Sequence, residues 1–185
     1  LYPEVKDRLD DIEKIVVTTH ESAIRIISKE GPLANPADRD HCLQYMIAVP
    51  LIMGDLSADH YEDSFHAKNS MIDTLRNKME IVESADYTRD YLDPEKRSIA
   101  NAIQVFFCDG TKTVVADVEY PISHRRRREA AMPVLETKLH PTLLTCFLPA
   151  KADQTLTPSQ SPPSLASVPL PTSQIIPSPS TRNPP

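Results

Sequence analysis

The segment from Gly31 to Gly54 constrains the fold most, because it carries a complete set of helix signals. Asn35 is a strong N-cap, and Pro36 suits the first helical position, where no backbone N–H is needed. Apolar residues then recur at helical spacing, Pro50 interrupts the pattern, and Gly54 is a natural stop. The sequence therefore predicts one helix from Pro36 to about Met53.

The same segment brings three acid–base side chains together. Residues three and four positions apart share one face of a helix, so Asp38, His41 and Tyr45 are expected to form one ridge. A carboxylate, an imidazole and a phenol on one ridge could transfer protons, although a free phenol has a pKa of about 10. The alternatives are a solvated cap with salt bridges, and a Tyr45 ring that is simply buried at the edge of the core.

The remaining pattern predicts an α+β domain. A glycine-containing turn at Asp109-Gly110-Thr111 separates two β-rich runs and predicts a hairpin of Asn101–Cys108 with Thr113–Tyr120. Pro133 is expected to start a helix through Leu139 that Pro141 interrupts. The other expected elements are a polar lead-in at 1–10, a strand at 11–19, helices at 21–29 and 70–79, helical turns at 57–63 and within 86–97, and a short strand at 80–83.

The character of the chain changes at Pro149, and ten of the eighteen prolines occur from this residue onward. Serine and threonine accompany them, and such a segment buries too little apolar area to offset its ordering entropy. We therefore expect a domain at 1–148 and a disordered tail at 149–185. A frameshift or retained intron would produce such a tail, and a polyproline ligand for an SH3 or WW domain is the alternative.

Charge and composition exclude several classes of function. The net charge is −6, which argues against general affinity for nucleic acid, and no run of 18 apolar residues predicts a membrane span. The three cysteines are widely spaced, which favours reduced thiols, and no set of ligands has the spacing of a metal site.

The basic run Arg125–Arg128 predicts a structural or interdomain role first, and a substrate-facing role for His124 or Arg125 second.

Four pieces of the chain carry a family resemblance in their order and spacing. They are Gly31–Val49 (Gly-Pro-Leu-Ala-Asn-Pro-Ala-Asp-Arg-Asp-His-Cys-Leu-Gln-Tyr-Met-Ile-Ala-Val), Ile12–His20, Gly54–Asp63 and the stretch from Asp109 through Arg128. Together these pieces resemble the MmgE/PrpD family, over about residues 1–139, and the resemblance is greatest to the members that dehydrate 2-methylcitrate. It implies the small C-terminal α+β domain of that family, with helices packed on an antiparallel sheet that includes the hairpin.

The resemblance implies elimination of water from 2-methylcitrate to give 2-methyl-cis-aconitate in propionate breakdown, without a metal or cofactor. Such an elimination needs a base, an acid and cationic groups for the carboxylates of the tricarboxylate substrate. By resemblance Tyr45 is the tyrosine that this domain contributes to the cleft. The candidate residues are Tyr45 and His41 for catalysis, and Arg39, Asp38, His124 and Arg125 for substrate binding.

The resemblance also implies partners. A large helical domain preceding Leu1 would supply the other catalytic groups, so we expect this chain to be inactive alone. Full-length members are expected to form homodimers and, from the pathway, to reside in the mitochondrial matrix of a eukaryote. The alternatives are a member resembling cis-aconitate decarboxylase and a stand-alone α+β interaction module without catalytic activity.

Overall fold

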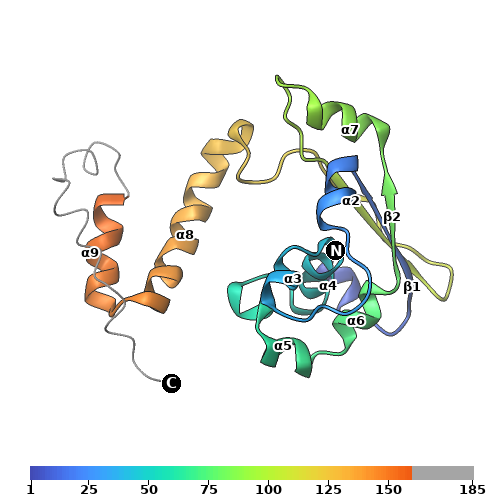
Figure 1. Ribbon diagram of the computed structural model, residues 1–185, viewed down its shortest axis with the longest axis horizontal. Helices are drawn as coiled ribbons and strands as arrows, with labels where there is room; N and C mark the ends of the chain where they lie inside the picture. Colours follow the sequence, from blue (N-terminus) through green and yellow to red (C-terminus); the bar gives the residue numbers. More distant parts are fainter. Residues whose placement is uncertain (160–185) are drawn as a thin grey trace. The chain divides into compact units, whose positions relative to one another are not determined.

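The computed structural model describes residues 1–159, with side chains described to Thr155. It divides into two compact units, Leu1–Pro121 and a second unit that begins at Ile122. The first unit is a mixed sheet with helices, which confirms the predicted α+β class (Figure 1). Within the described residues no helix combines the length and the apolar character needed to cross a membrane.

The sheet of the first unit has the order β2-β1-β3-β4. β1 (Ile12–Thr19) pairs antiparallel with β3 (Asn101–Phe107), and β3 pairs antiparallel with β4 (Ala116–Val118). β2 (Met79–Glu83) instead runs parallel to β1, which departs from the predicted antiparallel arrangement. Parallel neighbours require a long crossover connection, and the helices between β1 and β2 supply it.

The predicted hairpin is confirmed, with Gly110 in the left-handed conformation (φ +81°) at its turn. Its second strand is shorter than predicted, because next to the turn only an isolated bridge pairs Phe106 with Lys112. The Thr113 hydroxyl accepts the backbone N–H of Val105 at 3.1 Å. In a regular ladder a backbone carbonyl oxygen would accept this N–H. Pairing of named strands therefore resumes only at Ala116, opposite Ile103.

Helices pack one face of β1 and β3 to form the core. Buried side chains of the sheet (Ile15, Val17, Val105) and of the helices (Val49, Leu75) belong to one apolar cluster. The helical elements of this unit are α1 (Tyr2–Val5), α2 (Glu21–Ile27), α3 (Pro36–Asp40), α4 (Leu43–Met53), the 3₁₀ turn η1 (Ala58–Tyr61), α5 (Asp63–Lys68), α6 (Met71–Arg76) and α7 (Ala85–Leu92).

The prediction of one continuous helix from Pro36 to Met53 is wrong. Asn35 caps α3 and Gly54 ends α4 in a left-handed conformation, as predicted, but the chain breaks between them. Cys42 is extended (φ −123°, ψ 111°) and fully buried, and its thiol lies 3.7 Å from the carbonyl oxygen of Lys29. Because of this break, the expected ridge of Asp38, His41 and Tyr45 on one helix is not present.

The second unit contains the 3₁₀ turn η2 (Arg125–Arg127), α8 (Arg128–Cys146) and α9 (Pro149–Ser159). α8 continues through Pro133 and Pro141, where the sequence predicted a shorter helix from Pro133 to Leu139. α9 occupies the first part of the predicted disordered tail, so that prediction is corrected for residues 149–159. A proline at the first helical position suits its start. Residues 160–185 of the predicted tail lie outside the described residues.

Candidate functional site

Tyr45 lies in α4 with its side chain fully buried. Its hydroxyl donates to the carbonyl oxygen of His60 at 2.7 Å. The phenol ring packs against Tyr61 (centroids 5.9 Å apart) and meets the His66 ring edge-on at 5.7 Å. Burial raises the pKa of the Tyr45 phenol to about 12, although the nearby Arg39 guanidinium acts in the opposite direction. The hydroxyl therefore holds its proton at neutral pH.

Arg39 lies in α3 and is almost as deeply buried, with 2% of its surface exposed. Its Nε donates to the carbonyl oxygen of Tyr61 at 2.7 Å, and its Nη1 donates to that of Leu33 at 3.4 Å. Its Nη2 forms an ion pair with the carboxylate of Asp63. Every guanidinium nitrogen thus has a protein partner, which is what a buried cation requires.

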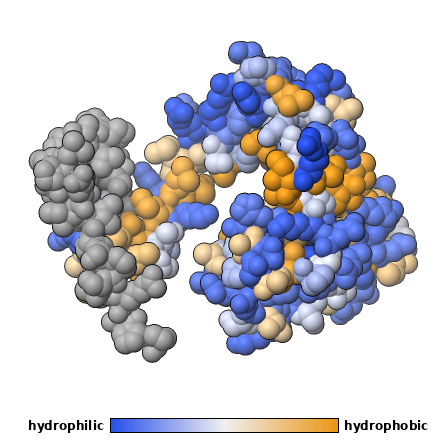
Figure 2. All heavy atoms as spheres, viewed as in Figure 1, coloured by the Kyte–Doolittle hydropathy of each residue, from blue (hydrophilic) through white to orange (hydrophobic). Residues whose placement is uncertain are grey.

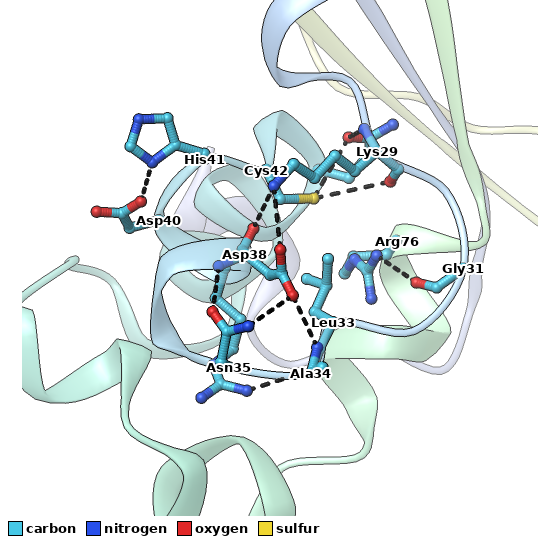
Figure 3. A network of polar contacts seen from close by, with 12 residues as sticks. Lys29, Gly31, Leu33, Ala34, Asn35, Asp38, Asp40, His41, Cys42 and Arg76 are labelled. Atoms are coloured by element: carbon cyan, nitrogen blue, oxygen red, sulfur yellow. Dashed lines mark hydrogen bonds and ion pairs between the residues drawn. The ribbon is translucent and has the colours of Figure 1, made fainter.

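Asp38 holds the start of α3 (Figure 3). Its carboxylate accepts the backbone N–H of Ala34 at 3.2 Å and the side-chain amide of Asn35 at 3.0 Å, and it pairs with Lys29 at 3.4 Å. In return the side-chain amide oxygen of Asn35 accepts the backbone N–H of Asp38 at 2.9 Å. The predicted cap is confirmed, and Asp38 is part of it.

His41 lies at the break between α3 and α4, with 67% of its side chain exposed. Its Nδ1 interacts with the carboxylate of the neighbouring Asp40. Figure 3 shows the imidazole directed away from the Lys29–Asp38 contacts. The structure therefore brings the buried side chains of Tyr45 and Arg39 together at the segment His60–Asp63. Asp38 and His41 have their contacts elsewhere.

His124 and Arg125 belong to the second unit. His124 is the N-cap of η2, where its Nδ1 accepts the backbone N–H of Arg126 at 3.2 Å. The basic run that follows forms η2 itself and the first residue of α8. His124 therefore has a local structural role at the start of this turn.

Sequence reasoning did not find the segment His60–Asp63 as a neighbour of Tyr45. The sequence predicted only a helical turn at 57–63 there, and Ser57 forms a capping box with His60 at the start of this turn. The contacts that matter span 15 residues for Tyr45 to His60 and 24 residues for Arg39 to Asp63. Neither separation leaves a periodic signature that a single sequence could reveal.

A separate polar pocket of about 550 Å³ lies beside the loop that precedes α3. Several of its lining groups contact one another: the Gln44 side chain accepts the Lys29 backbone N–H at 3.2 Å and donates to Ser28 at 2.9 Å. Arg76 donates to the carbonyl oxygen of Gly31 at 2.9 Å. These contacts stabilise the loop. Among the described residues no three or more His, Cys, Asp or Glu side chains are grouped as metal ligands would be.

Comparison with known proteins identifies the domain. A family model described as the MmgE/PrpD C-terminal domain matches residues 1–158, ten residues beyond the domain end predicted from sequence. The 2-methylcitrate dehydratase of Escherichia coli (strain K12) is 53% identical over 137 residues, 74% of this chain and 28% of that protein. The probable 2-methylcitrate dehydratase of Saccharomyces cerevisiae is 50% identical over 145 residues, 77% of this chain and 28% of that protein.

A third relative, "2-methylcitrate dehydratase, mitochondrial" of Yarrowia lipolytica, is 53% identical over 129 residues, 70% of this chain and 25% of that protein. The chain therefore spans about a quarter of the length of these relatives. The resemblance deduced from the motifs around Gly31–Val49 is confirmed by a match that covers most of the chain. This chain belongs to the MmgE/PrpD family, and the part that matches is the C-terminal domain of that family.

Proposed function

We propose that this chain is part of a 2-methylcitrate dehydratase, a hydro-lyase that forms 2-methyl-cis-aconitate in the methylcitrate cycle of propionate catabolism. The observation that carries the proposal is the identity of 53% over 137 residues to the Escherichia coli 2-methylcitrate dehydratase. Relatives of the same name in two yeasts, at 50% and 53% identity, support it.

In this proposal Tyr45 is the proton donor or a substrate hydrogen-bonding group. Elimination of water removes a proton alpha to a carboxylate and protonates the departing hydroxyl. Burial raises the pKa of the Tyr45 phenol to about 12, so the phenol is protonated at neutral pH and can donate a proton but cannot act as the base. In this structure the hydroxyl donates to the His60 carbonyl at 2.7 Å, so this hydrogen bond has to break before the proton can pass to a substrate.

Four other candidate residues have roles in this proposal. His41 is exposed and would orient the substrate or contact a carboxylate, and Asp38 maintains the start of the helix that precedes it. His124 and Arg125, in the second unit, would add positive charge for the tricarboxylate. The acid–base chemistry of such an elimination requires no metal or cofactor, and we propose that none takes part.

We further propose that a large helical domain completes the active site. The relatives are more than three times the length of the part that this chain matches, so groups outside it are available to act as the base and to bind carboxylates. The chain alone is then inactive, and the whole enzyme is a homodimer. The name of the Yarrowia lipolytica relative supports a mitochondrial matrix location for a eukaryotic enzyme.

The proposal is tested by replacing the aligned part of the Escherichia coli relative with this chain and measuring 2-methylcitrate dehydration from the absorbance of the conjugated product. We expect a functional chimera, and Tyr45→Phe should lower its kcat/KM by about 10²-fold or more, the usual contribution of a general acid. Tyr87→Phe is the matched control, because the Tyr87 hydroxyl instead contacts Asp117 at 2.9 Å.

A folded chimera that dehydrates other hydroxy acids but not 2-methylcitrate would overturn the substrate assignment. An unchanged kcat/KM for Tyr45→Phe would remove Tyr45 from the mechanism. Clear turnover of 2-methylcitrate by the 185-residue chain alone would contradict the need for a second domain.

A further inference from the structure

We infer that Arg39 is a positioning residue that holds the segment His60–Asp63 over the Tyr45 hydroxyl, and that this segment controls access to that hydroxyl. The inference gives Arg39 a different role from direct substrate binding. Its catalytic meaning rests on the proposed function of Tyr45, but the contacts themselves do not depend on which reaction the enzyme performs.

Two buried side chains from different helices hold the same short segment. Tyr45, from α4, donates to the carbonyl oxygen of His60 at 2.7 Å. Arg39, from α3, donates to the carbonyl oxygen of the next residue, Tyr61, also at 2.7 Å, and pairs with the carboxylate of Asp63. Arg39 therefore holds Tyr61, the residue next to His60, and so fixes the position of the His60 carbonyl that accepts from Tyr45.

The segment also closes the space around the phenol. The Tyr61 ring stacks on the Tyr45 ring, and the His60 ring packs on Phe65 at 4.6 Å. With the segment in this position Tyr45 has no exposed surface. Because the hydroxyl is bonded to this segment, we expect a substrate to reach it when the His60–Asp63 segment moves away, and the contacts of Arg39 oppose that movement.

The surroundings of Arg39 exclude a simple carboxylate-binding role in this arrangement. The guanidinium is 2% exposed, and all three of its nitrogens already contact protein acceptors. The carboxylate of Asp63 is 74% exposed, so the ion pair joins a buried cation to the outer side of the segment. This geometry lets Arg39 restrain the segment from within, since a charged pair with additional hydrogen bonds is stronger than a neutral contact.

The inference is tested on the whole 185-residue chain without substrate, by amide hydrogen exchange and by the ¹³Cζ resonance of labelled tyrosine. Tyr45→Phe identifies the Tyr45 resonance by its loss. Arg39→Gln should speed exchange of residues 60–66 about tenfold and move the Tyr45 resonance, because the lost contacts are charge-assisted hydrogen bonds. Exchange at the core strand residues Val17 and Val105 should stay slow.

Two variants guard against general loss of the fold, and one serves as the matched control. Asp63→Asn alters the same ion pair from its exposed side and should give changes of the same kind but smaller. Arg39→Lys keeps the charge and should restore part of the protection. Asp59→Asn removes an exposed carboxylate from the same turn, and should leave both measurements as in the unmodified chain.

The inference is overturned if Arg39→Gln and Asp63→Asn leave both the exchange of residues 60–66 and the Tyr45 resonance unchanged. It is also overturned if exchange rises equally at Val17 and Val105, because Arg39 would then act on stability as a whole. Either result is independent of catalysis, so failure of the dehydratase proposal and failure of this inference are distinguishable.

Discussion

Helices α4 and α8 both contain interior prolines, yet packing stabilises them very differently. α4 has eleven residues and buries six of them around Pro50: Leu43, Gln44, Tyr45, Ala48, Val49 and Leu51. α8 has nineteen residues, with Pro133 and Pro141 inside it, and buries only Ala131. Figure 2 shows apolar surface along α8, where Met132, Val134, Leu135 and Leu144 are exposed. Burial can offset the cost of an interior proline in α4, whereas α8 has little packing within the described residues to do so.

Matched leucine substitutions test this contrast with the largest expected effect. Leu51→Ala in α4 should lower the free energy of unfolding by roughly 2–5 kcal/mol, because it leaves a cavity in the core. Leu135→Ala in α8, at a side chain that is 48% exposed, should change it by less than about 0.5 kcal/mol. Urea unfolding followed by far-UV circular dichroism reports on the helices of both units. Tyrosine fluorescence separates the first unit from the second, since all six tyrosines precede Ile122 and the chain has no tryptophan. Equal effects of the two substitutions would contradict the comparison.

Replacing the prolines tests the same contrast from the opposite direction. Pro141→Ala should restore a backbone donor to α8 and stabilise it by up to about 3 kcal/mol, seen as slower amide exchange of residues 138–146. Pro50→Ala should gain less in α4, because Pro50 is half-buried among packed neighbours and its loss also removes contacts. A larger gain at Pro50 than at Pro141 would show that packing does not offset the proline in α4.

The contrast also explains which elements could be predicted from the sequence. The start of α3 at Asn35-Pro36 and the end of α4 at Gly54 have local causes, and both are confirmed. The break at Cys42 could not be predicted, because its buried thiol contacts a residue 13 positions earlier and the apolar periodicity continues across it. The parallel pairing of β1 with β2 likewise depends on residues about 65 positions apart, such as Ile15 and Met79.

The candidate site shows the same limit. Motif resemblance singled out Tyr45 and Arg39, but not that both are buried or that both contact the segment His60–Asp63. Burial of an arginine depends on acceptors that arrive from elsewhere in the chain, here the Tyr61 carbonyl and the Asp63 carboxylate. A single sequence shows which residue types could make such a contact, but not how far apart these residues lie in the folded chain.

The start of α3 differs from the start of α8, and this difference gives a prediction of intermediate size. Asn35 caps α3 with its side chain, whereas the N-cap of α8 makes no side-chain cap hydrogen bond. Asn35→Ala should therefore destabilise the first unit by about 1 kcal/mol in the tyrosine-detected urea transition. Asn77→Ala is the matched control, because Asn77 is exposed and follows a helix rather than starting one, and it should cost less than about 0.5 kcal/mol. A cost no larger for Asn35→Ala than for the control would mean that packing alone determines where α3 begins.

The smallest expected effect is a pH dependence that belongs to the first unit. His20 caps α2 by accepting the backbone N–H of Ala23 at Nδ1 (3.2 Å), and its ring stacks on Tyr91 at 4.1 Å. Burial lowers the pKa of His20 below its ordinary value of 6.5, so the folded state favours the neutral ring that can accept this bond.

Because the unfolded state binds the proton more readily than the folded state, the contribution of His20 to stability is complete above about pH 6.5. It is lost as the pH falls from there toward the lower pKa of the folded state. The urea concentration at the unfolding midpoint should therefore decrease as the pH is lowered from 7.5 to 5. His20→Asn should make this decrease smaller, since asparagine can cap the helix without titrating. If the unmodified chain and His20→Asn lose stability in parallel over this range, other groups cause the pH dependence. The cap of α2 then remains intact when His20 is protonated.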